Sequence, residues 1–291
     1  MGWAETFIAV DWGTTNRRAW RIAGGGVEAE FEDGRGVLAI EGDTFPAAVA
    51  EIRERLGNHP MLLAGMVGSN RGWAEAPYVP CPAGLDDLVG RLCWPEPGRT
   101  AIVPGLSSAD PPDVMRGEEV QIFGAIGAGL APKNGLVCHP GTHNKWVHVE
   151  DGRIARFRTV MTGEMFSLLK EHSILSDLLA ADAVTVDEPF RDGVRRGLAG
   201  VALTAELFAV RAGVLLGARR KEDAGDYVSG LLIGADIAFG AGGAAQEILV
   251  MGRAELTRLY AAGLDVAGLR PRQIDGEAAF IAGIQAIAGR L

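Results

Sequence analysis

Short apolar runs alternate along the chain with longer segments of helical periodicity. Four apolar runs have the length of buried strands: 7–10, 61–64, 136–138 and 248–251. Six segments carry apolar residues at helical spacing: 46–56, 120–130, 162–179, 193–216, 253–262 and 276–288. Because strand and helix patterns interleave from one end of the chain to the other, the sequence predicts an α/β fold.

An internal repeat is visible where two of these apolar runs end. The first run leads into Asp-Trp-Gly-Thr-Thr-Asn-Arg at 11–17, and the run at 136–138 leads into His-Pro-Gly-Thr-His-Asn-Lys at 139–145. Both loops hold Gly-Thr, then Asn, then a basic residue, and strand-like sequence follows each of them. Two such loops in equivalent positions predict duplicated domains, each opening with a strand, a polar Gly-Thr loop and a returning strand. Since 131–135, Ala-Pro-Lys-Asn-Gly, has linker composition, we expect the domains to be 1–132 and 133–291, with the last helix of the second able to pack back on the first.

Composition and charge limit the possible partners. The chain has 291 residues, 48% of them hydrophobic and 22% charged, which are the values of a globular protein. Its net charge of −9 disfavours a general nucleic-acid binder, because phosphate contacts need surplus Lys and Arg. No apolar run approaches the roughly 20 residues of a membrane span, and the first residues lack the pattern of a signal peptide. Three cysteines without CxxC spacing fit a reducing compartment, so a cytoplasmic protein without nucleic-acid or membrane partners is expected.

The two Gly-Thr loops carry groups that suit a phosphate. Backbone N–H groups and hydroxyls of Gly13 and Thr14 would converge on one anion, and Gly141 and Thr142 would supply a second set. Asp11, at the end of the first strand, could hold Mg²⁺ directly or through water. Two ordinary hairpins with Gly-rich turns are the alternative reading. No lysine follows a glycine, so the chain has no Walker A loop.

Two further stretches carry candidate chemistry. Glu118 and Glu119 immediately precede an apolar helix, where carboxylates either stabilise the helix N-terminus or act as a general base. Position alone does not choose between these roles. Residues 65–82 follow a strand and are too rich in Gly and Pro to be regular. Arg, Trp and Glu in such a loop can grip a sugar acid, or the loop can fold on its own aromatic side chains.

Together these motifs resemble the 2-dehydro-3-deoxygalactonokinase family, sugar-acid kinases of the actin/hexokinase/Hsp70-like ATPase superfamily. The resemblance covers nearly the whole chain. The hairpin at 9–16 is common to the superfamily, whereas the Gly-Met and Glu-Ala-Pro-Tyr segments of 65–78 and the Pro-Gly-Thr-His of 140–143 are more specific. The family's Met-Arg-Gly-Glu-Glu and Met-Thr-Gly-Glu segments stand at 115–119 and 161–164.

The resemblance implies two RNase H-like lobes with ATP in the cleft between them. It also implies transfer of the ATP γ-phosphate to the 6-hydroxyl of 2-dehydro-3-deoxy-D-galactonate, in D-galactonate catabolism. Asp11 would place Mg²⁺, Glu118 or Glu119 would be the base, and Arg71 would hold the carboxylate of the sugar acid. The nucleotide would contact Gly13, Thr14, Thr15, Asn16, Gly141, Thr142, His143, Lys145 and Gly252, and the sugar acid would contact Ser69, Arg71, Trp73, Glu75 and Tyr78.

One residue departs from the superfamily pattern, and several questions stay open. Many members carry an acidic residue at the start of the second loop, where this chain has His139, so Asp11 is the stronger metal candidate. A superfamily phosphatase acting on polyphosphate or nucleotide phosphate would use the same hairpins and the same Glu. A non-catalytic regulator that binds a sugar acid or nucleotide is the other alternative. The epimer of the keto-deoxy acid stays open, and so does the oligomeric state, for which a homodimer is the commonest arrangement.

Overall fold

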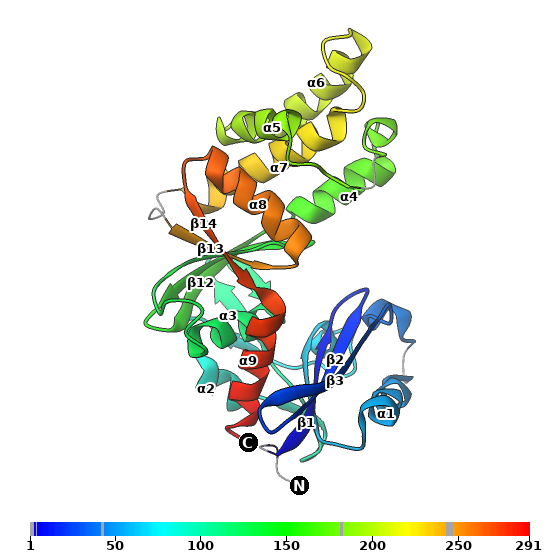
Figure 1. Ribbon diagram of the computed structural model, residues 1–291, viewed down its shortest axis with the longest axis vertical. Coiled ribbons are helices and arrows are strands. Elements are labelled where there is room, and N and C mark those ends of the chain that lie inside the picture. Colours follow the sequence, from blue (N-terminus) through cyan, green and yellow to red (C-terminus); the bar gives the residue numbers. More distant parts are fainter. Residues whose placement is uncertain (1–2, 4, 42–43, 181–182, 243–246) are drawn as a thin grey trace. The chain divides into compact units, whose positions relative to one another are not determined.

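The chain is described from a computed structural model that covers residues 3, 5–41, 44–180, 183–242 and 247–291. Its contacts divide it into two units (Figure 1). The first unit comprises Met1–Asn134, Val149–Arg156 and Gly276–Leu291, and the second comprises Gly135–His148 and Phe157–Asp275. Two segments from the later part of the sequence, the hairpin tip at Val149–Arg156 and the last helix, are grouped with the first unit.

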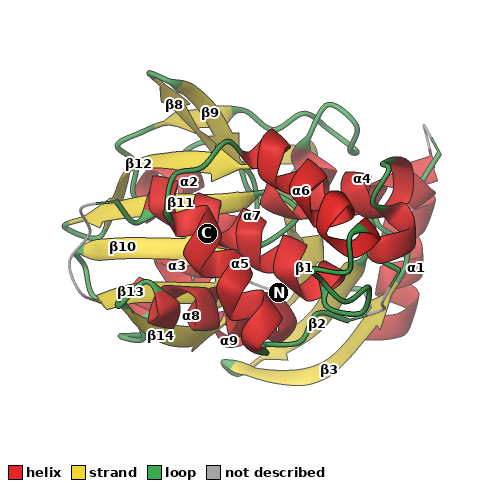
Figure 2. Ribbon diagram, turned by 90° about the horizontal axis from the view of Figure 1, so that it is seen from above, coloured by secondary structure: helices red, strands yellow, loops and turns green. Residues whose placement is uncertain are grey.

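Two sheets share the order of five strands, and the first has a sixth at one edge; the order of the second sheet can be followed in Figure 2. The first runs β3-β2-β1-β4-β7-β6 and the second β12-β11-β10-β13-β14. In each sheet, the first three strands in the sequence are neighbours, and the first of them lies towards the middle of the sheet. That strand pairs in parallel with the fourth strand: β1 with β4, and β10 with β13. The predicted α/β class with a duplicated architecture is thus confirmed. The strands are β1 (Thr6–Trp12), β2 (Arg17–Ala23), β3 (Gly26–Asp33), β4 (Met61–Gly65), β6 (Cys93–Glu96), β7 (Thr100–Ile102), β10 (Gly135–His139), β11 (Asn144–Glu150), β12 (Arg153–Val160), β13 (Glu247–Gly252) and β14 (Arg270–Asp275).

The first unit also holds a small sheet of order β5-β8-β9. Its strands are β5 (Tyr78–Pro80), β8 (Gly105–Ala109) and β9 (Pro112–Met115), and the unit's helices are α1 (Phe45–Leu56), α2 (Leu85–Val89), α3 (Glu118–Gly127) and α9 (Gly276–Ala288). In α1, Phe45, Val49, Ile52 and Leu56 recur at helical spacing and are buried in the core against β1 and β4. The face of the helix predicted from its apolar spacing is therefore the face that covers the sheet.

Helices α4, α5, α6 and α7 gather beyond the sheet of the second unit (Figure 1). The helices of this unit are α4 (Thr162–His172), α5 (Glu188–Leu198), α6 (Leu203–Leu215), α7 (Ala224–Gly240) and α8 (Ala254–Val266). The expectation of one helix over 193–216 is wrong, because α5 ends at Leu198 and Gly200 follows it with φ 69°, a left-handed conformation that stops the helix. The helix expected over 162–179 likewise ends at His172 and gives way to a short 3₁₀ turn.

Glycines allow the closest helix contacts in the first unit. A Cβ atom on Gly124 of α3 would lie 1.9 Å from the Ala279 carbonyl oxygen of α9, and one on Gly283 would lie 2.0 Å from that of Val120. Neither position can hold a larger residue unless the backbone moves, so these glycines fix the spacing between α3 and α9. The last helix of the chain is in this way packed on the helix that begins at the Glu pair.

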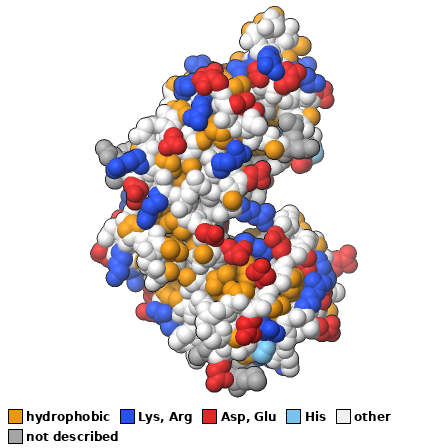
Figure 3. Space-filling model, viewed as in Figure 1, with side chains coloured by type: hydrophobic (Ala, Val, Ile, Leu, Met, Phe, Trp, Pro, Cys, Tyr) orange, Lys and Arg blue, Asp and Glu red, His pale blue; other side chains and the backbone are white. Residues whose placement is uncertain are grey.

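Charge is distributed without one dominant patch on the face seen in Figure 3, where basic and acidic side chains are interspersed. The net charge of −9 is the difference between many acidic and many basic side chains, and on this face the two kinds are mixed. Within the described parts of the chain, no helix has both the length and the apolar character that crossing a bilayer requires.

Candidate active site

The first hairpin follows β1 and begins with a partly exposed carboxylate. Asp11 is about one-fifth exposed, and its Oδ2 accepts a hydrogen bond of 2.8 Å from Arg18 Nη2 on the neighbouring strand. Arg18 Nη1 also lies 3.4 Å from Glu277 Oε2 at the start of α9. One oxygen of Asp11 is therefore held by an arginine, and the side chain stays partly accessible at the carboxyl end of β1.

The turn itself is closed by its own backbone. Gly13 N–H donates to the Asn16 carbonyl oxygen at 2.9 Å and so closes the turn. Gly36 supports the turn from behind: its N–H donates to Thr15, and a Cβ on it would lie 2.3 Å from the Thr14 carbonyl oxygen. Thr14 and Thr15 are exposed at the tip of the turn.

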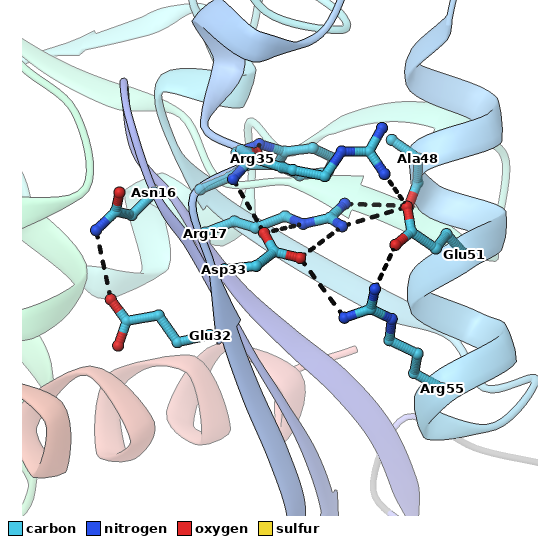
Figure 4. A network of polar contacts seen from close by, with 9 residues as sticks. Asn16, Arg17, Glu32, Asp33, Arg35, Ala48, Glu51 and Arg55 are labelled. Carbon is cyan, nitrogen blue, oxygen red and sulfur yellow. Dashed lines mark hydrogen bonds and ion pairs between the residues drawn. The ribbon is translucent and has the colours of Figure 1, made fainter.

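A buried arginine underlies this hairpin (Figure 4). Arg17 donates from Nε and Nη2 to the two oxygens of Asp33 at 2.9 and 3.0 Å, and from Nη1 to the Ala48 carbonyl oxygen at 3.3 Å. Its Nη2 also lies 3.4 Å from Glu51 Oε2. Asn16, the last residue of the turn, donates to Glu32 at 3.5 Å. The side chains of Asn16 and Arg17 are thus engaged with β3 and α1.

The two consecutive glutamates occupy different environments. Glu119 is fully buried, and both its oxygens lie 2.8 Å from Gly117 N. Burial, with the nearby Glu118 adding to it, raises the pKa of Glu119 to about 8. Glu118 is only half-buried, and its Oε2 accepts from Arg116 N at 3.0 Å. Glu118 is therefore the carboxylate that a bound molecule can reach, whereas Glu119 is largely protonated at neutral pH.

Three elements of the first unit converge on Gly65, at the end of β4. A Cβ on Gly65 would lie 3.5 Å from Asp11 Oδ1, and a Cβ on Gly117 would lie 3.3 Å from the Gly65 Cα. Gly65 and Gly117 have φ values of 93° and 109°, which favour glycine. The end of β1, the end of β4 and the start of α3 therefore meet, and they bring Asp11 and the Glu pair into one region.

The loop after β4 presents only some of its predicted side chains. Arg71 and Glu75 are exposed. Ser69 is buried and serves the loop itself, because its Oγ donates to the Met66 carbonyl oxygen at 2.8 Å and accepts from Arg71 N–H at 3.2 Å. Trp73 is partly buried against the core of the first unit. Ser69 and Trp73 thus shape the loop, which leaves Arg71 and Glu75 as the side chains that a ligand would meet first.

Arg116, to which no role was assigned from the sequence, lies against the loop that follows β4. Its guanidinium lies 4.4 Å from the centroid of the Tyr78 ring, and its Nη2 donates to the Ala76 carbonyl oxygen at 2.8 Å. Its Nε and Nη1 are buried and have no hydrogen-bond partner among the described residues. Arg116 and Tyr78 therefore tie the loop to the residues just before Glu118. The available signal was its place in the Met-Arg-Gly-Glu-Glu segment.

The second hairpin is placed in the other unit, at the end of β10. His139 is 8% exposed, and a Cβ on Gly252 would lie 3.8 Å from His139 Cε1 and 3.1 Å from the Pro140 carbonyl oxygen. The structure thus brings Gly252, at the end of β13, against the start of the second hairpin. Both had been predicted to contact the nucleotide. His139 is held among these groups rather than exposed as a free metal ligand.

The start of α4 packs closely on the tip of this hairpin. A Cβ on Gly163 would lie 2.6 Å from the Gly141 carbonyl oxygen, and Glu164 N–H donates to the Thr142 carbonyl oxygen at 2.9 Å. The side chain of Glu164 lies 2.5 Å from His143 Nε2. Lys145, expected to approach a phosphate, is 6% exposed, and its Nζ donates to the His143 carbonyl oxygen at 3.4 Å.

A pocket of about 270 Å³ opens beside the second hairpin. Gly141 and Thr142 form part of its wall, together with Thr162 and Gly163 from α4. Much of the remainder is apolar, and the pocket lies wholly within the second unit. Further lining residues include Phe166, Leu232, Ile233, Leu256, Leu259 and Tyr260. Lys170 and Glu255 also line it. A largely apolar pocket of this kind suits a flat, uncharged ring.

Two α/β units of the same strand order, each with a Gly-Thr hairpin after its first strand, define the class of actin-like ATPase folds. Within that class, residues 11–287 match the 2-keto-3-deoxy-galactonokinase family. The chain is 38% identical to the 2-dehydro-3-deoxygalactonokinase of Escherichia coli (strain K12), over 97% of each chain. The chain belongs to this family.

Solved structures agree with this placement. A Sinorhizobium meliloti protein assigned as a 2-dehydro-3-deoxygalactonokinase superposes with a TM-score of 0.91 at 38% identity, over 98% of both chains. Component A of the (R)-2-hydroxyglutaryl-CoA dehydratase of Acidaminococcus fermentans matches with a TM-score of 0.51 at 15% identity, again over 98% of both chains. The second similarity is one of fold alone.

Proposed function

We propose that this protein is an ATP-dependent kinase that phosphorylates the 6-hydroxyl of 2-dehydro-3-deoxy-D-galactonate. The observation that carries the proposal is the half-buried Glu118, held at the start of α3 where Gly117 approaches Gly65, which in turn lies near Asp11. An accessible carboxylate in the same region as a second carboxylate, at the end of β1, suits activation of a hydroxyl next to a metal-bound phosphate. The name of the family and of the Escherichia coli relative supports the choice of acceptor.

In this proposal each unit contributes different groups. Glu118 orients or deprotonates the acceptor hydroxyl, and Arg71 pairs with the carboxylate of the sugar acid. Thr14 and Thr15 donate to phosphate oxygens from the first unit, and Gly141 and Thr142 donate from the second. The apolar pocket beside Thr142 takes the adenine ring. Little covalent work falls to the protein, so positioning and charge stabilisation supply most of the rate.

Asp11 is the residue that would hold Mg²⁺. In the described parts of the chain, no three His, Cys, Asp or Glu side chains come together as a metal site made by protein alone. Mg²⁺ in kinases is commonly held by one or two carboxylates together with phosphate oxygens and water, so a single partly exposed Asp11 fits this role. When bound there, the ion would neutralise charge on the β- and γ-phosphates.

A coupled ADP-release assay with Mg-ATP tests the proposal. It offers the 2-keto-3-deoxy acids of both epimers, D-galactonate, or no acceptor. We expect turnover only with the galactonate-derived keto acid. ADP release without any acceptor would instead indicate a phosphatase, and ATP binding without turnover on any acceptor would indicate a regulator. Turnover with the gluconate-derived epimer alone would keep the kinase and change its substrate.

A further inference from the structure

A buried carboxylate lies behind the second hairpin, at a position to which the proposed reaction assigns no role. Asp236, on α7, is 3% exposed. It accepts hydrogen bonds from Asn144 Nδ2, 3.1 Å from each carboxylate oxygen, and from Trp146 Nε1 at 2.7 Å. The hydroxyls of Thr162 and Tyr260 donate to its Oδ2 as well. Four side chains therefore converge on one carboxylate.

These donors come from the elements that form the nucleotide half of the proposed site. Asn144 is the first residue of β11, directly after the hairpin tip. Thr162 begins α4 and precedes Gly163, the residue packed on the Gly141 carbonyl oxygen. Thr162 and Tyr260 also line the pocket. Asp236 thus joins the end of the hairpin, the helix against its tip and one wall of the pocket.

The strand before the hairpin is tied into the same network. The buried Cys138 thiol donates to Asn144 Oδ1 at 3.4 Å, which fixes the direction of the Asn144 amide and leaves its Nδ2 for Asp236. Burial raises the pKa of Cys138 and of Tyr260 well above their usual values, so both groups keep their protons and act as donors. The base of the hairpin is therefore bridged from Cys138 through Asn144 to Asp236.

Only an acceptor without protons satisfies all of these partners. A carboxylate offers about four lone-pair sites and no donor, whereas an amide at the same position would turn an NH₂ group toward other donors. Hydrogen bonds to a charged group are also stronger than those between neutral groups. The site therefore selects Asp over its isosteric amide, although both have the same shape.

We propose that Asp236 is a positioning residue for the nucleotide: it holds residues 140–143 and the pocket wall in the conformation that binds the phosphates and the adenine ring. This inference rests on the proposed function, in which that nucleotide is ATP. The side chains that donate to Asp236 belong to the second unit and adjoin the hairpin and the pocket, so its effect should fall on nucleotide binding rather than on sugar-acid binding.

Asp236→Asn is the main test. We expect the KM for ATP, and the Kd for a non-hydrolysable ATP analogue with Mg²⁺, to rise at least about tenfold, the usual effect of leaving buried donors unpaired. The KM for the keto acid should stay within about threefold. Ile237→Ala is the matched control: it removes a buried side chain from the next position of α7, lowers Tm, and should leave the KM for ATP within about twofold.

Milder variants keep the test decisive if Asp236→Asn does not fold. Thr162→Val and Tyr260→Phe each remove one donor while keeping the side chain's shape, and each should raise the KM for ATP about two- to fivefold. Because they act through one acceptor, their effects should not multiply in the double variant. Folded variants with the wild-type KM for ATP would overturn the proposal.

A measurement without ligand separates this inference from the proposed function. Amide hydrogen exchange at residues 141–145 should become faster in Asp236→Asn than in Ile237→Ala, whether or not ATP is the true ligand. If the wild-type protein fails to bind the ATP analogue, the proposed function is wrong. Amide hydrogen exchange then still tests whether Asp236 holds the hairpin in its conformation. Unchanged exchange at the hairpin would exclude that role.

Discussion

The two hairpins share a sequence pattern and a position in their sheets, yet buried groups of opposite charge support them. Behind the first lies Arg17, a cation paired with Asp33 on the next strand and with Glu51 on α1. Behind the second lies Asp236, an anion on α7 that is surrounded by neutral donors. The residue that aligns with Arg17 is Lys145, whose Nζ turns to the backbone of its own hairpin.

The difference is also one of distance along the chain. The first hairpin is supported by residues that follow it within one β-β-α segment, so its conformation is set locally. The second depends on Asp236, 92 residues after Asn144, and on the helices that form the pocket. We infer that the conformation of the first hairpin is set by its own segment, whereas that of the second is coupled to the pocket beside it.

The largest expected effect concerns the carboxylates of the first unit. Glu118→Gln should lower kcat about 10²- to 10⁴-fold, the usual contribution of a general base, with little change in the KM for ATP. Glu119→Gln should change kcat far less, because the buried side chain is already largely protonated at neutral pH. Steady-state kinetics of both variants check this assignment. A larger loss in Glu119→Gln than in Glu118→Gln would reverse the roles.

Removing Arg17 should show how strongly the first hairpin depends on its cation. Arg17→Met leaves Asp33 and Glu51 without their buried partner, and breaking such a pair costs about 3–5 kcal/mol. We expect about 3 kcal/mol, because both carboxylates are partly exposed and keep Arg55 as a neighbour. Urea unfolding at pH 7 measures the loss. The exposed Arg55→Met is the control, at under about 1 kcal/mol.

The loss in Arg17→Met should depend on pH. Burial works against ionisation of Asp33, but the hydrogen bonds from Arg17 and from Arg35 N–H outweigh it and lower the pKa of Asp33. A lowered folded-state pKa gives stability that is present above the unfolded-state pKa and is lost as the pH falls through the folded-state value. The difference between wild type and Arg17→Met should therefore shrink on acidification. A constant difference would show that Arg17 acts through packing alone.

Much of the fold could be predicted because the signals were local. Strands β1, β4 and β13 and helices α1 and α9 follow from apolar runs and helical spacing, and the hairpin repeat follows from residues adjacent in sequence. Helix α7 was missed, since an apolar segment buried on most of its faces gives little periodicity. Asp236 was missed with it, because its role comes only from partners far away in sequence.

The candidate site, too, could be predicted only where the signal was local in sequence. Sequence placed both glutamates at one helix start but could not choose between them, since the choice depends on which is buried. It assigned no role to Arg116, whose partners Ala76 and Tyr78 lie in a loop some 40 residues earlier. Nor could it show that the N–H of Gly13 closes the first hairpin, because residue types do not specify this turn geometry.

The raised pKa of Glu119 predicts a second pH effect in the first unit. Between the ordinary value of 4.5 and about 8, the folded protein keeps a proton that the unfolded chain has lost. Stability is therefore greatest below that window and falls as the pH rises through it, by at most about 1.4 kcal/mol per pH unit. Glu119→Gln lacks this titration, so it should gain on wild type between pH 5 and pH 8 in urea unfolding. Glu54→Gln, on the exposed face of α1, should keep the wild-type pH dependence.

The smallest expected effect tests whether the tip of the second hairpin is held by α4. In Gly163→Ala the new Cβ would lie 2.6 Å from the Gly141 carbonyl oxygen, so the hairpin or the helix start must shift. Overpacking of this kind costs about 1–3 kcal/mol, and part of that cost should appear as a KM for ATP raised about three- to tenfold. Gly213→Ala in α6 is the control: its Cβ would meet its neighbour at an ordinary 3.5 Å, so both KM values should stay unchanged. An increase confined to the KM for the keto acid would contradict the coupling of this hairpin to the nucleotide, because it would place the contact between Gly163 and Gly141 on the acceptor side of the reaction.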